Sequence, residues 1–274
     1  MIHTKGSLQV LKKPYVNFLG IPIEALTYED MAHRIDHWIS KNGARSHHIA
    51  CVNAFCVALS TQNKELFRIY NGADIIGPDG MPFVKWIRRF LKVPCDRFDA
   101  PDIILYLADI SKDKKYSFYF YGGSPEVLEG MCSFLTKRFP HINIVGKMSP
   151  PFRPMTPEED KQLCDEINSL RPDIVCVGLG TPKQDYWIDE HLNKIRGSVF
   201  VASGATFDFF GGRIQMAPER IRQAGFEWLY RLFSKDFTRL WRRYTIYNFV
   251  FMWKFLLQQL GVKVTAPQPW TRPE

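Results

Sequence analysis

The chain has 274 residues, of which 46% are hydrophobic, so it can bury one large core, with or without an appendage, and two independent domains are disfavoured. Its start lacks the apolar stretch of a secretory signal peptide, and no run of about 18 apolar residues could span a bilayer. We therefore expect a cytoplasmic protein. The six cysteines form no C-x-x-C pair and several lie in apolar runs, which indicates reduced, structural thiols.

The formal net charge of +8 is distributed unevenly along the chain. From Arg213 to the C-terminus there are eleven Lys and Arg residues against four Asp and Glu, so this last quarter carries +7 of the excess. The first 212 residues are close to neutral. Such an asymmetry predicts a separate binding partner for the C-terminal segment.

Short β-prone runs alternate with helical segments along the first 212 residues. This alternation predicts an α/β, Rossmann-like core with a mainly parallel central sheet flanked by helices. Thr27 is the predicted N-cap of the first helix. The expected strands are 17–26, 48–52, 116–121 and the runs that begin at 74, 173 and 199; the expected helices are 28–42, 54–71, 81–91, 101–111, 125–139 and one ending near 170. The proline-rich loop 149–160 resembles a mobile flap or a connector, and we assign no chemistry to it.

Five of these runs end in Gly, Asn, Pro or Ser, as in DIIGPDGMP and VFVASGATFD. Ligands of open parallel sheets bind outside the carboxyl ends of the strands, so the five loops are predicted to share one crevice. For any one loop, the alternative is that glycine merely ends a strand. The most informative run is DIVCVGLGTPKQDYW, where Gly178 and Gly180 precede a helix start bearing Lys183 and Gln184. This pattern is typical of a site for a phosphorylated ligand.

Asp79 lies between a proline and a glycine just beyond an apolar strand, where its carboxylate can project into the crevice as a general base. The alternative is an ordinary turn residue. Asn53 offers an amide at the neighbouring strand end, and its alternative role is a helix cap. Arg97 can hold a diphosphate, or it can form an ion pair with Asp96 or Asp99.

Segment 225–260 mixes aromatic residues and Leu with Arg and Lys, and it contains neither Pro nor an internal Gly. It predicts one or two helices. Lys254 interrupts the apolar run 249–257, which is too short to span a bilayer but suits an interfacial helix. An anionic leaflet attracts each nearby basic side chain by about 1 kcal/mol, so we predict peripheral binding to the inner face of the cytoplasmic membrane. The alternatives are aromatics packed on the core beneath a solvated basic face and, ranked last, nucleic acid.

Several familiar catalytic motifs are missing. There is no Asp-x-Asp pair of the kind that holds a divalent ion in many nucleotide-sugar enzymes, so we predict metal-independent chemistry without a cofactor. The absence of a Walker loop and of G-x-G-x-x-G argues against a kinase and a nicotinamide-dependent oxidoreductase. The absence of G-x-S-x-G argues against a serine hydrolase.

An ordered set of motifs remains, and together they resemble the bacterial WecB/TagA/CpsF glycosyltransferase family over residues 17–245. The motifs are VN at 52–53, ADIIGPDGMP at 73–82, DR at 96–97, YGGSPEV at 121–127, VGLGTPKQDYWI at 177–188, GATFDFFGG at 204–212 and APERIRQAGFEWLYRL at 217–232. The resemblance implies a membrane-associated, inverting, metal-independent enzyme. Such an enzyme moves a sugar from a UDP donor to a polyprenyl-diphosphate-linked acceptor, and its C-terminal appendage contributes arginines to the active site.

By the same resemblance, Asp79 corresponds to the catalytic base, and Cys51 stands where the family often has a threonine. The predicted substrate-binding residues are Cys51, Asn53, Arg97, Gly178, Gly180, Lys183, Gln184, Arg231, Arg239, Arg242 and Arg243. The appendage arginines in this set are candidates for contact with the diphosphate. The transferred sugar stays open among N-acetylmannosamine, its uronate and glucose.

We expect three parts: an α/β glycosyltransferase core over 1–212, a basic, aromatic helical appendage over 213–262 and a flexible tail over 263–274. The alternative is a protein of a different functional class, a non-catalytic membrane-docking component of a polysaccharide-assembly complex. It would use the same basic, aromatic appendage to dock. A UDP-sugar epimerase or dehydrogenase is disfavoured because the glycine fingerprint and a Tyr-x-x-x-Lys pair are missing. A homo-oligomer also stays open, since the apolar face of the appendage could be buried between subunits.

Overall fold

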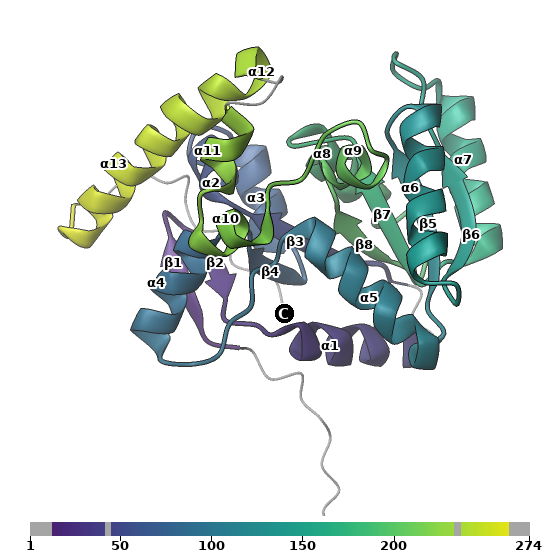
Figure 1. The fold of residues 1–274 in the computed structure, drawn as a ribbon, viewed down its shortest axis with the longest axis horizontal. Helices are drawn as coiled ribbons and strands as arrows, with labels where there is room; N and C mark the ends of the chain where they lie inside the picture. Colours follow the sequence, from purple (N-terminus) through teal and green to yellow (C-terminus); the bar gives the residue numbers. More distant parts are fainter. Residues whose placement is uncertain (1–12, 42–44, 233–236, 263–274) are drawn as a thin grey trace, which may run out of the picture.

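The computed structural model describes residues 13–41, 45–232 and 237–262, with the backbone alone for 237–239. Its centre is a six-stranded, all-parallel sheet in the order β4-β3-β8-β7-β5-β6 (Figure 1). The strands are β3 (His47–Val52), β4 (Ile75–Pro78), β5 (Ser117–Gly122), β6 (Asn143–Met148), β7 (Ile174–Gly178) and β8 (Val199–Ala202). The predicted α/β, Rossmann-like architecture is confirmed.

Helices cover both faces of the sheet, so its strands are buried on both sides. Alternate residues of β5 enter opposite cores: Phe118 and Phe120 pack in one, Tyr119 and Tyr121 in the other. The first core includes residues of α1, α5 and α6, and the second includes residues of α7 and α8. The helices are α1 (Tyr28–Ser40), α2 (Ala54–Ser60), α3 (Lys64–Gly72), α4 (Met81–Leu91), α5 (Ala100–Lys114), α6 (Pro125–Arg138), α7 (Pro157–Leu170), α8 (Lys183–His191) and α9 (Thr206–Phe210).

Three sequence-based expectations need correction. The run 17–26 is not one strand but an antiparallel hairpin of β1 (Tyr15–Phe18) and β2 (Ile21–Glu24), outside the main sheet. Its two-residue turn, Leu19 and Gly20, has positive φ at both positions, as a tight hairpin turn requires. The helix expected over 54–71 is broken between α2 and α3, where Asn63 caps α3. Strand β6 was not predicted, because an edge strand with little buried surface lacks a strong apolar pattern.

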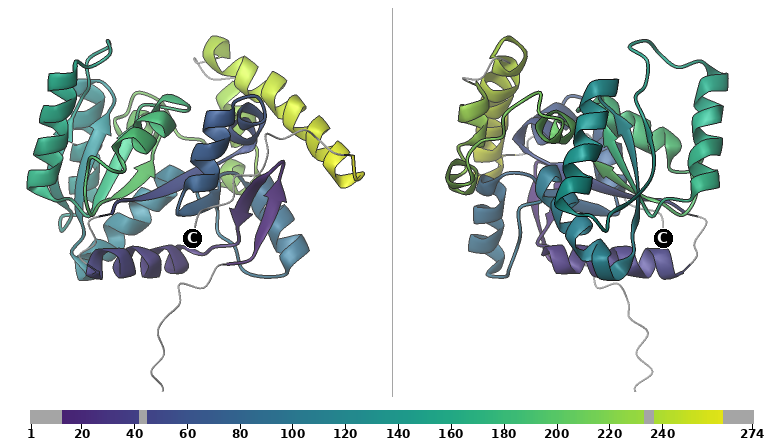
Figure 2. Two further views of the ribbon diagram at one scale, coloured as in Figure 1. Left: turned by 180° about the vertical axis from the view of Figure 1, so that it is seen from behind. Right: turned by 45° about the vertical axis from the view of Figure 1, so that its right-hand side comes forward.

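The C-terminal segment forms α10 (Glu219–Ala224), α11 (Glu227–Leu232) and a continuous helical stretch made of α12 (Phe237–Arg242), the π-helical turn η1 (Arg243–Tyr247) and α13 (Asn248–Gln259). Figures 1 and 2 show it at the end of the molecule opposite β6 and α7. Within the described residues, no helix combines the length and apolar character needed to cross a membrane. The division at 212/213 stays a prediction, and the tail 263–274 lies outside the described residues.

For segment 225–260 we considered an exposed apolar face and, as an alternative, aromatics packed on the core. Each of the two describes one face of α13. Phe251 and Phe255 are buried, and the Phe255 ring centroid lies 5.2 Å from that of Phe18 on β1. The Gln258 side chain also accepts a hydrogen bond from the Leu19 amide at 3.0 Å. Other apolar side chains of α13 and of its C-cap residue are exposed: Phe249, Met252, Trp253 and Leu256 in the helix, and Leu260 at the cap. The aromatics therefore pack on the core along one face only.

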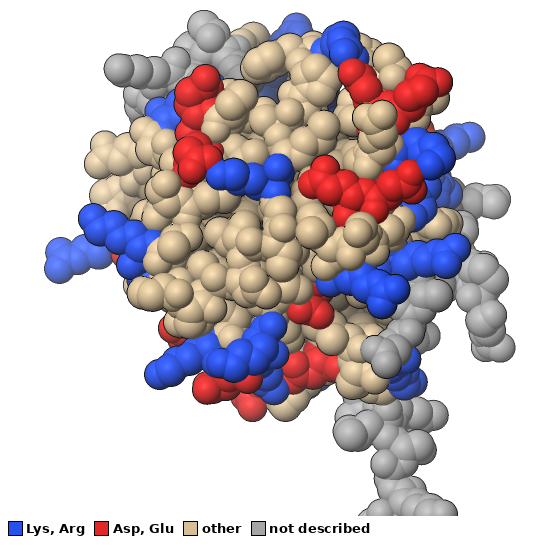
Figure 3. Space-filling view, turned by 90° about the vertical axis from the view of Figure 1, so that its right-hand side faces the viewer, with Lys and Arg blue, Asp and Glu red and all other residues tan. Residues whose placement is uncertain are grey.

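The end of the molecule that carries β6 and α7 shows no single-sign charge patch, since acidic and basic side chains alternate across it (Figure 3). Many of them are paired, as in Arg153 with Glu159 and Lys161 with Asp165. The excess positive charge of the sequence lies in the segment from Arg213 onwards, whose described helices α11, α12 and α13 are at the other end.

A buried ion-pair network joins the C-terminal helices to the core. Arg222 of α10 is 5% exposed, and its guanidinium donates to Asp102 of α5 at 2.6 Å and to Asp99 at 3.2 Å. Arg97 donates to Asp102 at 2.6 Å and to Glu227 of α11 at 3.3 Å. Two arginines and three carboxylates thus tie α10 and α11 to the amino end of α5.

Replacing Arg222 by alanine should lower the free energy of unfolding by about 3 kcal/mol, because the partly buried Asp99 and Asp102 would keep only Arg97 as a counter-charge. Chemical denaturation measures this loss. The control is Arg220→Ala on the same helix, at an exposed position, which should change stability by no more than about 0.5 kcal/mol. Equal effects of the two substitutions would contradict a stabilising network.

Candidate active site

A cavity of about 1940 Å³ lies at the carboxyl ends of the parallel strands. All five loops that were predicted to share a crevice line it: Asn53 follows β3, Asp79 follows β4, Gly123 follows β5, Gly180 follows β7 and Ser203 follows β8. The C-terminal helices close its other side with Arg231, Arg242 and Arg243. The cavity therefore combines strand-end loops with the basic C-terminal segment.

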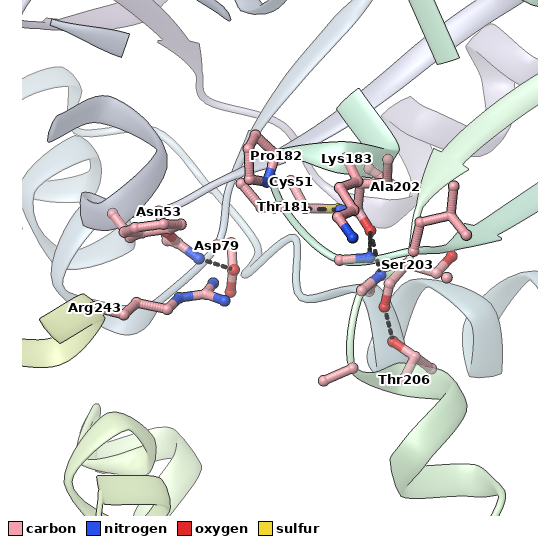
Figure 4. Close-up of a pocket in the computed structure, with 18 of the residues that line it drawn as sticks. Cys51, Asn53, Asp79, Thr181, Pro182, Lys183, Ala202, Ser203, Thr206 and Arg243 are labelled. Atoms are coloured by element: carbon pink, nitrogen blue, oxygen red, sulfur yellow. Dashed lines mark hydrogen bonds between the residues drawn. The ribbon is translucent and has the colours of Figure 1, made fainter. Parts of the chain in front are cut away.

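Asp79 and Asn53 form the centre of the polar part of this cavity. The Asn53 amide nitrogen donates to a carboxylate oxygen of Asp79 at 2.7 Å, while its Oδ1 accepts from the Cys56 amide and caps α2. Both expectations for Asn53, a site residue and a helix cap, thus describe one side chain. Figure 4 shows the Arg243 guanidinium directed towards the Asp79 carboxylate.

The Asp79 carboxyl has a raised pKa, chiefly because it is buried. The Asn53 donor and the charges of Arg97, Arg243 and Arg231 act in the opposite direction without cancelling the effect of burial. Burial and the nearby Asp79 charge also raise the pKa of Asp99 and of Glu227, which line the same cavity. A carboxylate with a raised pKa is a stronger base, as general-base catalysis near neutral pH requires.

Arg97 lines the cavity, but its guanidinium already faces three carboxylates. Of the two ion pairs expected from the local sequence, the one with Asp99 is present at 3.2 Å. Asp96 instead accepts from the Tyr28 amide. The partners of Arg97 indicate a role in holding α11 over the site, and its contact with a diphosphate stays a prediction.

Gly178 at the end of β7 and Gly180 just after it are required to be glycine for different structural reasons. A Cβ on Gly178 would lie 2.4 Å from the Phe207 ring, so only glycine fits there. Gly180 has φ +78° and faces open space, a conformation that glycine adopts without strain. Lys183 begins α8 as an exposed side chain on the cavity wall.

Gln184 is buried, and its side-chain oxygen is already used within the protein. It accepts hydrogen bonds from the Gly180 amide at 3.1 Å and from the Gly204 amide at 2.9 Å. It therefore ties the loop after β7 to the loop after β8. Its amide nitrogen has one long bond of 3.4 Å, to Thr181, and is the part of the side chain best placed to meet a ligand.

The appendage arginines that the structure describes lie against aromatic rings. The guanidinium carbon of Arg243 is 4.6 Å from the Phe55 ring centroid, and that of Arg231 is 5.2 Å from the centroid of Phe209. Arg242 is exposed beside Trp241. The Arg239 side chain lies outside the described residues. Arg243 begins the π-helical turn η1, and such turns often occur at functional sites.

Cys51 is half-buried on the cavity wall, and burial raises the pKa of its thiol well above the usual value. The thiol is therefore neutral at pH 7 and, where a threonine would offer a hydroxyl, supplies only a weak donor.

Sequence reasoning missed two features near the cavity. The proline-rich loop, to which we assigned no chemistry, lines it from Pro150 to Pro157, and the Ser149 hydroxyl donates to the Gly123 carbonyl oxygen at 2.7 Å. The run of prolines was the available signal. Asp185 of α8 is 2% exposed, and burial raises its pKa to about 7.

One group of side chains among the described residues has the spacing of metal ligands: Asp160, Cys164 and His191. Both oxygens of Asp160 are already engaged, one with His191 at 2.7 Å and the other with Lys194 at 2.7 Å. A cation at Asp160 would have to compete with the Lys194 ammonium group. Metal-independent chemistry stays a prediction.

Replacing Asn53 by serine should separate its two roles. Serine caps a helix about as well as asparagine, so stability should be kept, whereas Asn53→Ala should cost about 1 kcal/mol. Both variants remove the amide donor that stabilises the Asp79 carboxylate, so the pKa of Asp79 should rise further. Denaturant unfolding and a ¹³C NMR titration of the Asp79 carboxyl measure the two effects. An unchanged titration in Asn53→Ser would show that the amide does not control Asp79.

Comparison with known proteins places this geometry in context. The model of the "Glycosyl transferase WecG/TagA/CpsF family" matches residues 16–264. The chain is similar to the N-acetylglucosaminyldiphosphoundecaprenol N-acetyl-beta-D-mannosaminyltransferase of Staphylococcus aureus (strain MW2), with 25% identity over 90% of this chain and 94% of the relative. It is also similar to the protein of the same name from Bacillus spizizenii (strain ATCC 23059 / NRRL B-14472 / W23), with 29% identity over 66% of this chain and 68% of the relative.

Proposed function

The chain belongs to the WecG/TagA/CpsF family and is a glycosyltransferase, and we propose that it transfers a sugar from a UDP-sugar to a polyprenyl-diphosphate-linked acceptor. The observation that carries this proposal is the half-buried Asp79 carboxylate, which lies in a large cavity beside an amide donor and the Arg243 guanidinium. The names of both relatives describe transfer to a diphosphoundecaprenol-linked N-acetylglucosamine. Those names support the acceptor class.

The names of the relatives also give the transferred group as N-acetyl-beta-D-mannosaminyl. We take this sugar as the first donor to test, with the uronate and glucose as the other candidates. Family membership favours a catalyst over a non-catalytic membrane-docking component, and the raised pKa of Asp79 in a ligand-sized cavity agrees with this choice.

In the proposed reaction, the Asp79 carboxylate accepts the proton of the acceptor hydroxyl while that oxygen attacks the anomeric carbon. Attack comes from the face opposite UDP, so the bond to the UDP oxygen breaks as the new glycosidic bond forms, and the configuration inverts. UDP leaves with the bonding electron pair. The guanidinium groups of Arg243 and Arg231, which line the cavity, are placed to stabilise its charge. These cations allow the reaction to proceed without a metal ion.

Radiolabel transfer from a panel of UDP-sugars to a short polyprenyl-diphosphate N-acetylglucosamine tests this function. Transfer should persist in EDTA. Asp79→Asn should bind the donor normally yet lower kcat by about 10² to 10⁴, because the base is lost. In the wild type, kcat/KM should fall as the pH drops through the raised pKa of Asp79, since the protonated acid cannot accept a proton.

Three outcomes would count against the scheme. Near-normal turnover of Asp79→Asn would reject the base assignment. Loss of activity in EDTA, restored by a divalent ion, would reject metal independence. No transfer from any UDP-sugar would reject the donor class.

We also propose peripheral binding to an anionic membrane through the outward face of α13, defined as Trp253, Leu256 and Leu260. These side chains are 51% to 69% exposed and line no part of the cavity. The C-terminal segment that carries them also holds nearly all the excess positive charge. An apolar face within a basic segment is typical of interfacial helices.

The double substitution Trp253→Glu and Leu256→Glu should release the protein from anionic liposomes in a co-sedimentation assay, because it places charges on the inserted face. Deleting the segment is a poorer test, since it would remove Phe251 and Phe255 from the core. The control is Leu170→Glu, an exposed apolar position at the other end of the molecule. If liposome binding is unchanged but sedimentation velocity shows that a dimer has dissociated, the face is a subunit interface instead.

A further inference from the structure

The cavity that holds Asp79 has an apolar branch between α4 and α13. Its lining includes Phe83 and Trp86 of α4, Phe251, Met252 and Phe255 of α13, and Phe18 of the hairpin. We call these six residues the α4–α13 groove. No charged residue of either helix lines the cavity: Arg88 donates to the Cys95 carbonyl oxygen, and Lys254 donates to Thr61.

Aromatic contacts fix the walls of this groove. The ring centroids of Phe18 and Phe83 lie 4.5 Å apart, those of Phe83 and Phe251 5.3 Å, and those of Trp86 and Phe255 5.2 Å, all in edge-on geometry. Four of the rings are buried and form the floor. Trp86 and Met252 are 37% and 59% exposed and form the rim. The walls of the groove are therefore in place without a ligand, and its rim offers an exposed apolar surface beside the polar part of the cavity.

A ligand that fills both the polar part of the cavity and this branch must be amphipathic. Its polar group would face Asp79, Arg231 and Arg243, and its apolar part would extend along aromatic rings. A UDP-sugar can stack its uracil ring on one aromatic side chain, but it has no elongated apolar chain to extend along several. We propose that the α4–α13 groove binds the first isoprenoid units of the lipid acceptor, an inference that rests on the proposed function. The diphosphate would then lie where apolar lining gives way to arginines.

This site differs from the outward face of α13. Trp253, Leu256 and Leu260 do not line the cavity, whereas Phe251, Met252 and Phe255 do. One helix thus presents two apolar faces, and only the inner one meets the reacting end of the acceptor. A second copy of the chain or the bilayer surface could cover the outer face without entering the groove.

The test compares two soluble acceptors with the same N-acetylglucosamine diphosphate head, one bearing a butyl chain and one a farnesyl chain, without detergent or vesicles. Wild-type KM should be about tenfold lower for the farnesyl acceptor, because burying even part of such a chain in apolar surroundings has an effect of this size. Trp86→Gln and Met252→Gln should bring the ratio of the two KM values close to one. The control, Tyr15→Gln, changes an exposed ring of the same hairpin outside the cavity lining and should keep the ratio.

A preference for farnesyl that survives in both groove variants, or that is lost equally in Tyr15→Gln, would overturn the proposal. If neither acceptor is glycosylated, the proposed function fails, and the groove is then judged by binding alone. Calorimetric titration should show that the wild type binds farnesyl diphosphate about tenfold more tightly than butyl diphosphate. The same preference in Met252→Gln would refute the groove independently of catalysis.

Discussion

The site depends on arginines that balance the negative charge of a cluster of carboxyl groups. The charge of Asp79 raises the pKa of Asp99 and of Glu227, and such a cluster of carboxyl groups is stable only with cations nearby. Arg97 and Arg222 supply part of that compensation, and in doing so they hold α10 and α11 against α5. The C-terminal helices are therefore part of the electrostatics of the cavity as well as a cover over it. Arg97 thus holds α11 in place and also limits how far burial raises the pKa of Asp79.

Local sequence was sufficient where the determining partners are close along the chain. The N-cap of α1 was predicted at Thr27, and the structure shows a full capping box with Asp30. The convergence of five strand-end loops followed from the parallel alternation of strands and helices. The run 17–26 was predicted to be extended, but the turn at Leu19 and Gly20 that divides it into a hairpin was missed. The edge strand β6 was missed because it is not buried on both faces and so lacks the continuous apolar run that marks the central strands.

Partners distant in sequence could not be predicted. Glu227 lies 130 positions from Arg97, so the pattern around Arg97 could indicate an ion pair but could not identify this partner. For α13, packing on the core and exposure were treated as alternatives, yet the helix is apolar on more than one face and both occur. A helix that is apolar nearly all round must be covered on several sides, and sequence alone does not say by what. The role of Gln184 as a tie between two loops could likewise not be predicted, because the Gly204 amide that donates to its side-chain oxygen lies 20 residues away along the chain.

That tie has a consequence for nucleotide recognition. In many phosphate-binding folds, glycine-rich loops offer their main-chain amides directly to the ligand. Here the amides of Gly180 and Gly204 are directed at Gln184, so this pair of donors is satisfied internally. For the proposed nucleotide donor, these two amides would not discriminate between ligands, and that task would fall to other groups such as side chains, which single substitutions can alter without rebuilding a loop. A fold of this kind can diversify its donor preference while its central backbone stays unchanged.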